Sequence, residues 1–576
     1  MSFSHCLAPP LAVLSGNEPS TQSLSCVDSQ PSRPPLSEYL NPSQRNGSPR
    51  NDILVWKEAH IFRLPPELLA QIFLAVCERE LHSCINHSDK GSEPYPGFTL
   101  SYVCSYWHKI ALGTFRLWSK MEIVIMDKED VSPRTIELIN RFVDFHWKRM
   151  ANAPLDFILH IPSPCSVEFS HPERMSSTSL RKHITPILQR FYAEAHRWRN
   201  VSISAFEHQF YSEGTRLPPK LAVAENLELF SLYCRRGCPL PEGLPFWLRS
   251  LTLSGEWVID KELSRTTFPC LGSLTLRGAI HDSYLLHLSP LWLASSRTAV
   301  TLSDFCNIRS LPAHKHIACL AGTLTLAPTF YGDTESTNGA LSDLLEKLTL
   351  PNVTQLAFSY GPERKSPTSM YTRSFRFPTQ IFLNLLERSN CQAISHLTIE
   401  RYSMDTSGFL DILQKLPFLT YLSVDERCGP CDTRDSYPIL SPVVFNSLCW
   451  PSPPVDLIKR QEIAFWANSY SELLPRLTEV RFVFHRSWSK FSDRSDVWEM
   501  LESRRPGAAD GANELTCSKL CSPLKKIEIL VPDGSLENRD YERLANLRMM
   551  GMRISLEEYR PRVVTIGCCV PLISYD

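Results

Sequence analysis

The residues with the most catalytic-looking spacing are Cys428 and Cys431, which stand in the run Cys-Gly-Pro-Cys. A Cys-x-x-Cys pair at a helix N-terminus supports thiol–disulfide exchange, because the helix end lowers the pKa of the first thiol. Here residues 432–438 read DTRDSYP, which begins a helix poorly and places acids where they disfavour a thiolate. The βαβ pattern of thioredoxin-like proteins is also missing around the pair. A thiol oxidoreductase is therefore the weakest of the functional hypotheses.

Other cysteines and histidines form half-sites for zinc. A structural zinc site needs four nitrogen or sulfur ligands, usually as two close pairs. The half-sites are Cys234 with Cys238, Cys517 with Cys521, and His314 and His316 with Cys319. None is matched by a second pair, so we expect no metal ion. The sequence also lacks a glycine-rich phosphate loop, a His-Glu-x-x-His run and a Gly-x-Ser-x-Gly run. It therefore predicts no catalytic residues, no cofactor and no enzyme.

The composition is that of a globular protein with more than one domain. A chain of 576 residues is too long for a single core, and 43% hydrophobic with 21% charged residues is ordinary for such proteins. The 60 basic and 61 acidic residues give a net charge of −1. No overall field attracts nucleic acid or a membrane surface, so neither is an expected partner.

The sequence predicts a cytoplasmic or nuclear protein. Residues 6–14 are too short and too proline-broken for a signal peptide, and no stretch approaches the ~20 apolar residues of a membrane span. The 19 cysteines are then expected to be reduced. Residues 1–52 are rich in Ser, Pro, Asn and Gln, and we expect this leader to be disordered.

Apolar residues recur with a helical period between positions 64 and 118. The stretch 64–73 reads LPPELLAQIF and the period continues to Val76, while 100–111 reads LSYVCSYWHKIA. Pro65 suits the first turn of a helix, where no N–H donor is needed. Short isolated helices are unstable, so the two predicted helices must pack on each other and on further structure.

These residues resemble an F-box. The resemblance lies in Leu-Pro-x-Glu-Leu-x-x-x-Ile-Phe, in Val-Cys-x-x-Trp-x-x-Ile-Ala, and in the run TFRLWS at 114–119, which is similar to the third helix of fungal members. Residues 78–97 are longer than the usual connection between the first two helices, and we expect a surface loop there. An ordinary amphipathic helix pair within another domain is the alternative.

The resemblance implies a substrate-receptor subunit of a Skp–cullin–F-box ubiquitin ligase. The F-box, at 53–125, is expected to bind the Skp adaptor and through it a cullin, while other subunits carry out ubiquitin transfer. Sequence does not separate the matched residues that face the adaptor from those that form the core of the F-box. By analogy, the adaptor-binding residues are Leu64, Pro65, Leu68, Ile72, Phe73, Leu100, Val103, Cys104 and Trp107.

Helical and strand patterns alternate after the F-box. Within the connecting segment 126–205, the patterns predict a helix over 134–149, a strand over 155–161 and a helix over 183–196, followed by the run RWRNVSI at 197–203. Over 206–560 the pattern L-x-x-L-x-L then recurs at steps of 21–27 residues, which are typical of leucine-rich repeats. Three gaps of 49, 58 and 47 residues are about twice as long, and each leaves room for one degenerate repeat or an insertion. An irregular α/β domain is the alternative.

The repeat pattern predicts the central residue of each strand. These residues are Phe230, Leu251, Leu274, Val300, Leu324, Leu348, Leu397, Leu422, Val480, Ile527 and Ile554. The set Val353, Leu356 and Phe358 competes with Leu348 for one strand, and the sequence leaves that choice open. The runs 360–376, 425–442 and 503–516 interrupt the pattern and are expected to be exposed insertions.

The predicted fold is therefore α + α/β: a small three-helix F-box followed by an irregular leucine-rich-repeat-like α/β solenoid, with a C-terminal tail at 561–576. The repeats are expected to bind an unknown target protein. Basic pairs at 235–236 and 364–365 are candidate contacts for a phosphorylated target, although ordinary solvated charges are the simpler explanation. A repeat scaffold or sensor without a ligase role is the main alternative function.

Overall fold

The computed structural model describes residues 64–79, 96–124, 133–160, 177–204, 221–239, 243–258, 268–278, 297–303, 305, 316–328, 334–359, 375–427, 439–449, 473–485, 491–505 and 522–559. The chain divides into two compact units, Met1–Pro65 and Pro66–Asp576. Only Leu64 and Pro65 of the first unit are described. The predicted disordered leader lies outside the described residues.

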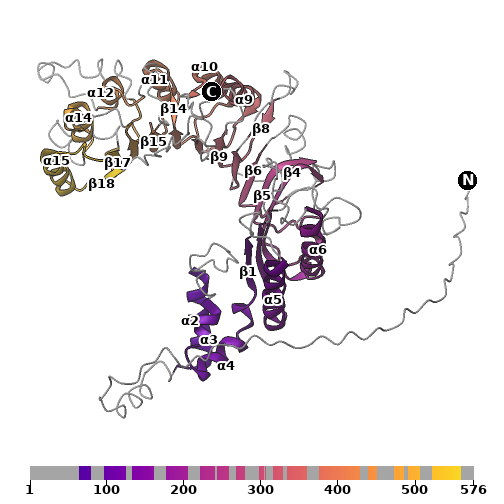
Figure 1. Ribbon diagram of the computed structural model, residues 1–576. Helices are drawn as coiled ribbons and strands as arrows, with labels where there is room; N and C mark the ends of the chain where they lie inside the picture. Colours follow the sequence, from indigo (N-terminus) through magenta and orange to yellow (C-terminus); the bar gives the residue numbers. More distant parts are fainter. Residues whose placement is uncertain are drawn as a thin grey trace, which may run out of the picture. The chain divides into compact units, whose positions relative to one another are not determined.

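A mixed α/β fold is built on one sheet of 14 parallel strands, in which each strand pairs with the next along the chain (Figure 1). The strands are β1 (Lys120–Val124), β2 (Leu155–His160), β3 (Trp198–Ser204), β4 (Leu229–Pro239), β5 (Ser250–Val258), β6 (Ser273–Arg277), β7 (Ala299–Ser303), β9 (Thr323–Ala327), β11 (Gln355–Phe358), β13 (His396–Glu400), β15 (Tyr421–Asp425), β16 (Glu479–Val483), β17 (Lys526–Pro532) and β18 (Arg553–Tyr559). Two short parallel pairs, β8 (Ile317–Ala318) with β10 (Leu348–Thr349) and β12 (Phe375–Arg376) with β14 (Tyr402–Ser403), lie outside this sheet.

The register of the sheet aligns apolar side chains into buried rows. Because successive residues of a strand point to opposite faces, every second residue reaches the core. One buried row contains Met121, Phe157, Val201, Phe230, Leu251, Leu274, Val300, Leu324, Leu356, Leu397, Leu422, Val480, Ile527 and Ile554. The side chains that alternate with the buried ones form the second face, which we call the polar face.

Helices lie along one side of the sheet. Figure 1 shows α9, α10, α11, α12, α14 and α15 together on one side of the sheet. The described α-helices are α2 (Pro66–Arg79), α3 (Pro96–Ser101), α4 (Ser105–Gly113), α5 (Pro133–Met150), α6 (Ser177–Ala193), α9 (Thr334–Lys347), α10 (Thr379–Ser389), α11 (Thr406–Gln414), α12 (Pro442–Leu448), α14 (Ser495–Ser503) and α15 (Asn538–Met549). Short 3-10 turns include η3 (Phe115–Leu117), η4 (Ala195–Arg197), η5 (Leu221–Val223) and η7 (Phe491–Asp493).

Most helices and strands predicted from the apolar periods are present. The helix predicted over 100–111 is divided into α3, which ends at Ser101, and α4, which begins at Ser105, and the run 114–119 holds only the 3-10 turn η3. Leu348 and Leu356 competed for one strand of the main sheet, and Leu348 belongs instead to the short strand β10 at the end of α9. The competing residue Leu356 takes that place, because β11 pairs with β9 on one side and β13 on the other. Both patterns alternate equally well, and only the packing of the full sheet selects between them.

The boundaries expected at 125 and 205 do not separate compact parts. Residues 120–124 form β1, and the connecting segment contributes β2 and β3 to the same sheet as the strands that follow. Pro66 to the C-terminus is accordingly a single compact unit. No strand was predicted at β1, because five residues directly after a helical motif are too few to show a period.

Hydroxyl groups link neighbouring strands where the strands begin. The residue just before a strand is Thr or Ser at several positions, and its hydroxyl donates to a carbonyl oxygen at the equivalent point of an adjacent strand segment. The hydroxyl bonds are Thr298 to Leu271, Thr354 to Gly322, Ser395 to Thr354, Thr420 to Ser395 and Thr478 to Thr420, at 2.7–3.2 Å. We call this set the hydroxyl ladder.

Arginine side chains satisfy backbone carbonyl groups that would otherwise be buried without a partner. Arg504, 1% exposed, donates to the carbonyl oxygens of Leu448, Leu473 and Leu474. Arg388 similarly donates to the carbonyl oxygens of Leu345, in the last turn of α9, and Leu348, the first residue of β10. The expectation that 503–516 is an exposed insertion is therefore wrong at Arg504, because a paired guanidinium tolerates burial.

Candidate partner-binding surfaces

Helix α2 carries two adjacent rows of apolar side chains that differ in exposure. The buried row consists of Leu69, Phe73 and Cys77. The exposed row, which we call the α2 stripe, consists of Leu68, Ile72 and Val76, which are 45%, 43% and 42% exposed. Residues four apart lie on the same face of a helix, so each row runs along one side of α2. One side of the helix builds the core and the adjacent side leaves apolar surface uncovered.

The buried row packs on α4 and η3. The rings of Phe73 and Trp107 lie with their centroids 4.9 Å apart. Cys104 begins α4, and its sulfur accepts a hydrogen bond from the backbone N–H of Trp107. Trp118, fully buried, donates from Nε1 to the carbonyl oxygen of Ala111 at 2.8 Å. This packing fixes the orientation of α2 relative to the helices that follow.

The structure separates the nine predicted adaptor-binding residues into exposed and buried groups. The exposed ones are Pro65, Leu68, Ile72 and Val103; the partly buried ones are Leu64, Leu100, Cys104 and Trp107; Phe73 is fully buried. Phe73 thus lies in the core formed by α2, α3, α4 and η3, which we call the helical unit, and offers no surface to a partner. Cys104 also has a local role as the cap of α4.

Three exposed apolar residues in the same elements were not among the predicted contacts. Val76 completes the α2 stripe, Tyr102 follows α3, and Phe115 begins η3. The helical period did include Val76, and that signal could have placed it with Leu68 and Ile72. For Tyr102 and Phe115 no sequence period exists, because both lie beside the ends of short helical elements.

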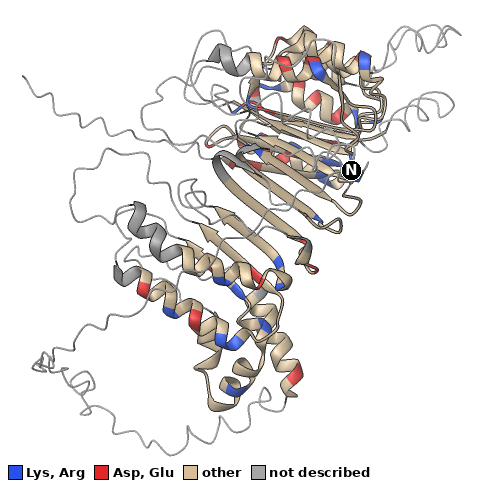
Figure 2. Ribbon diagram, turned by 90° about the vertical axis from the view of Figure 1, so that its right-hand side faces the viewer, with Lys and Arg blue, Asp and Glu red and all other residues tan. Residues whose placement is uncertain are grey.

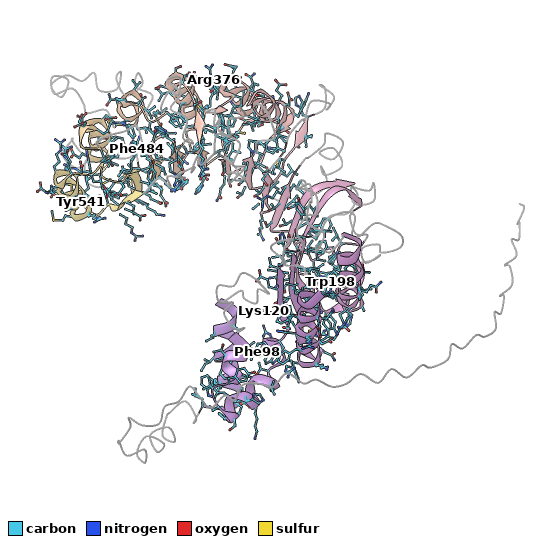
Figure 3. The ribbon with its side chains drawn as sticks, in the orientation of Figure 1. Phe98, Lys120, Trp198, Arg376, Phe484 and Tyr541 are labelled. Atoms are coloured by element: carbon cyan, nitrogen blue, oxygen red, sulfur yellow. The ribbon has the colours of Figure 1, made fainter. Side chains whose placement is uncertain are left out.

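An aromatic cluster joins the helical unit to the sheet. Phe98 of α3 contacts Phe145 of α5 with ring centroids 4.6 Å apart, and Trp118 contacts Phe145 at 5.3 Å. The guanidinium of Arg149 lies 3.3 Å from the centre of the Phe145 ring. Figure 3 labels Phe98 of α3 and Lys120, the first residue of β1. We call this set, with His146, the junction cluster.

His146 is the ionisable group at the centre of the junction cluster. It is fully buried, and its Nδ1 lies 2.9 Å from the carbonyl oxygen of Trp118. Burial among aromatic rings lowers its pKa from 6.5 to about 4, because the charged imidazolium would lose its hydration. At neutral pH the imidazole is uncharged, so its Nδ1–H donates to Trp118.

The polar face of the sheet has two chemically different regions. Over β5, β6, β7 and β9 its central row is Thr252, Thr275, Thr301 and Thr325. Over β16 and β17 the same row carries Arg481 and Glu528, whose charged groups are 3.2 Å apart. Figure 2 likewise shows few charged residues on the middle strands. A partner on this face would meet hydroxyl groups in one region and charges in the other.

A buried charged cluster connects both ends of the run 428–438. Glu426, directly after β15, accepts a hydrogen bond from the N–H of Leu440 at 2.6 Å. Arg494 donates to the carbonyl of the same Leu440 at 3.0 Å and is paired with Asp496. We call these residues the Glu426 clamp. Residues 425–442 were expected to be exposed, and this expectation is wrong for Glu426 and Leu440, which are buried.

Burial changes the protonation of Glu426. It raises the pKa of this carboxyl from 4.5 to about 7, while the N–H of Leu440 and the positive charge of Arg494 act in the opposite direction. The backbone N–H groups of Ile439 and His485 also lower the pKa, but desolvation is the largest effect. Burial therefore favours the protonated form of Glu426.

The cysteine and histidine half-sites considered in the sequence lie mostly outside the described residues. Cys428 and Cys431, His314, Cys517 and Cys521 lie outside the described residues, as do the side chains of Cys234 and Cys238. Cys319 is buried, and its thiol has a pKa raised to about 11 by burial. In the part of the chain that the structure describes, no group of three His, Cys, Asp or Glu side chains could hold a metal ion. Both basic pairs, 235–236 and 364–365, also fall outside the described side chains.

Comparison with known proteins adds no relative. No protein-family model matches the chain, and no curated protein matches it. Among the described helices, none is long and apolar enough to cross a membrane. The candidate surfaces therefore have to be judged from their own geometry.

Proposed function

We propose that this protein is the substrate-recognition subunit of a Skp–cullin–F-box ubiquitin ligase, acting in the cytoplasm or nucleus. The α2 stripe binds the Skp adaptor, and through it a cullin. The polar face of the sheet presents a surface to a target protein. The observation that carries the proposal is the α2 stripe, because its three large apolar side chains remain exposed beside a well-packed buried row.

The exposure of the α2 stripe supports a protein partner. Removing a large aliphatic side chain from water contributes about 1.5–3 kcal/mol when burial is complete, so three such residues on one helix face can drive association. Their order and spacing also agree with the resemblance to an F-box, which matches Leu68 and Ile72 to adaptor contacts. Val76 extends the same face by one turn.

The junction cluster supports a role in which two binding surfaces act together. Trp118 and Phe145 hold the helical unit against α5, and the N–H of Asp156 in β2 donates to the carbonyl of Ser119. A ligase receptor must keep its target at a fixed distance from the adaptor. Aromatic packing of this kind resists bending better than a flexible linker.

The proposal is tested by binding of the full-length chain to a purified Skp adaptor. We expect the wild type to bind and the double variant Leu68→Asp/Ile72→Asp to lose at least 100-fold in affinity, since two unpaired carboxylates would face an apolar contact. Both positions are exposed, so the variant should keep its thermal unfolding temperature.

A matched control uses the same chemical change at exposed apolar residues far along the chain. Phe246→Asp/Val443→Asp replaces two such residues outside the helical unit and should leave adaptor affinity unchanged. Equal adaptor binding by the wild type and the folded Leu68/Ile72 variant would refute the proposal. Absence of binding by the wild type would favour the alternative function, a repeat scaffold or sensor without a ligase role.

A further inference from the structure

A side chain of the preceding helix, α15, covers part of the outer edge of β18, the last strand of the sheet. Arg548, near the end of α15, donates from Nε and Nη2 to the carbonyl oxygen of Ile554 at 3.1 and 2.8 Å. β18 pairs with β17 along its whole length, and within the described residues no strand pairs with its other edge. The two hydrogen bonds therefore lie at the free edge of a 14-stranded sheet.

The direction of the Ile554 carbonyl follows from the backbone hydrogen bonds between β17 and β18. The N–H of Arg553 donates to Lys525, so the backbone groups of Arg553 point towards β17. Successive residues of a strand alternate, and those of Ile554 must point away from β17. In the interior of the sheet this carbonyl would accept a bond from the following strand. Arg548 occupies the place of that strand.

The side chains of β18 are complementary to a second copy of the same strand. Arg553 and Glu557 are both exposed and lie on the polar face on either side of Ser555, whose hydroxyl donates to Glu557 at 2.9 Å. If two β18 strands paired in antiparallel fashion about Ser555, Arg553 of each would lie opposite Glu557 of the other. Ile554 would then lie opposite Leu556, its N–H and C=O forming the hydrogen-bonded pair.

We propose that β18 is a self-association edge and that Arg548 keeps it closed, so that the partner this edge fits is a second copy of the chain. A two-fold axis makes both charge pairs equivalent, as in other isologous dimers. Charged residues on an edge normally repel unrelated strands. Here their order makes the identical strand the favoured one, and Arg548 blocks the carbonyl through which pairing would begin.

The test is the molecular mass of the full-length chain in solution, measured by light scattering over a range of concentrations. We expect the wild type to remain at the 65.7 kDa of one chain, and Arg548→Ala to rise towards twice that mass with concentration. The matched control is Arg543→Ala, which removes an exposed arginine from the same helix that lies over the ring of Trp498 instead of the strand edge. It should stay monomeric.

Charge reversal tests the register. Adding Arg553→Glu to Arg548→Ala places like charges opposite each other and should return the protein to the monomer. Adding Glu557→Arg to that double variant restores both pairs and should restore the dimer. If neither charge substitution changes the amount of dimer, the proposed β18 pairing is wrong.

Two further outcomes decide the role of Arg548. If Arg548→Ala stays monomeric at every concentration, or if the wild type dimerises as strongly, the closing role is wrong. Should Arg548→Ala fail to fold, Arg548→Lys keeps the charge and the aliphatic stem but loses the forked donor pair. It should then show a smaller shift of the same kind, and no shift would reject the proposal.

Discussion

The junction cluster and the Glu426 clamp both bury an ionisable group, but they surround it differently. His146 lies among aromatic side chains of α3 and α5 and beside Trp118, which follows η3, and its Nδ1 faces the carbonyl oxygen of Trp118. Glu426 lies beside Arg494 and a backbone N–H, in a cluster with a second carboxylate, Asp496. In both places burial outweighs the local partners and favours the neutral form.

A buried imidazole and a buried carboxyl give the free energy of unfolding opposite dependences on pH. His146 has a lowered pKa, so the unfolded chain binds its proton first and stability falls as pH drops from 6.5 towards 4. Glu426 has a raised pKa, so its contribution is complete below 4.5 and is lost as pH rises through about 7. The two slopes oppose each other over much of the same range.

Replacing Glu426 should have the largest effect. The wild type should lose about 3 kcal/mol of stability between pH 5 and 8 as Glu426 ionises, at roughly 1.4 kcal/mol per pH unit. Gln keeps the acceptor for the Leu440 N–H but cannot ionise, so Glu426→Gln should not show this loss. Hydrogen exchange of residues 439–449, corrected for the intrinsic rate, measures this locally. The exposed Glu502→Gln serves as the control. An unchanged pH dependence in Glu426→Gln would show that Glu426 is already ionised when folded.

Replacing His146 should change the slope of the free energy of unfolding against pH in the opposite direction to Glu426→Gln, and by a smaller amount. Asn can still donate to the Trp118 carbonyl but does not titrate, so His146→Asn should lose the fall in stability on acidification. Between pH 6.5 and 5, the free energy of unfolding of the wild type should fall by about 2 kcal/mol more than that of the variant. At lower pH, general acid unfolding hides the remaining difference. Hydrogen exchange of α5 against pH measures it. If both proteins lose protection in parallel on acidification, the lowered pKa is not the cause.

Replacing a residue of the hydroxyl ladder should have the smallest effect on stability, and this effect should not depend on pH. Thr298 is buried and donates to Leu271, so Thr298→Val leaves that carbonyl without its hydroxyl donor and should cost about 1 kcal/mol. The midpoint of denaturant unfolding should fall equally at pH 5 and pH 8. A pH-dependent loss would mean that the ladder is coupled to the junction cluster or the Glu426 clamp, and would weaken their comparison.

Sequence reasoning predicted the elements whose packing repeats a simple period. Strands centred on Leu251 or Leu422 were found because two buried rows require apolar residues two apart, and α5 because one face meets the sheet. It did not choose between Leu348 and Leu356, since both sets alternate. That choice depends on neighbours that are distant in sequence.

The candidate site was predicted only in part, for a related reason. The apolar face of α2 is wide enough to hold two rows, and the period does not tell which row the rest of the chain covers. The buried charges of Glu426 and Arg504 were missed because they occur in polar runs. Their hydrogen-bonding partners lie 14 to 56 positions away, where no local pattern can indicate them.

The strict order of the parallel strands bears on how the chain folds as it is made. Every strand of the sheet pairs only with the strands before and after it, so the early strands need nothing from the later ones. During synthesis, β1 to β3 can join as they leave the ribosome, and each new strand then adds to an existing edge. The growing edge is exposed at every stage, and α15 brings Arg548 to it only when the last strand has been added.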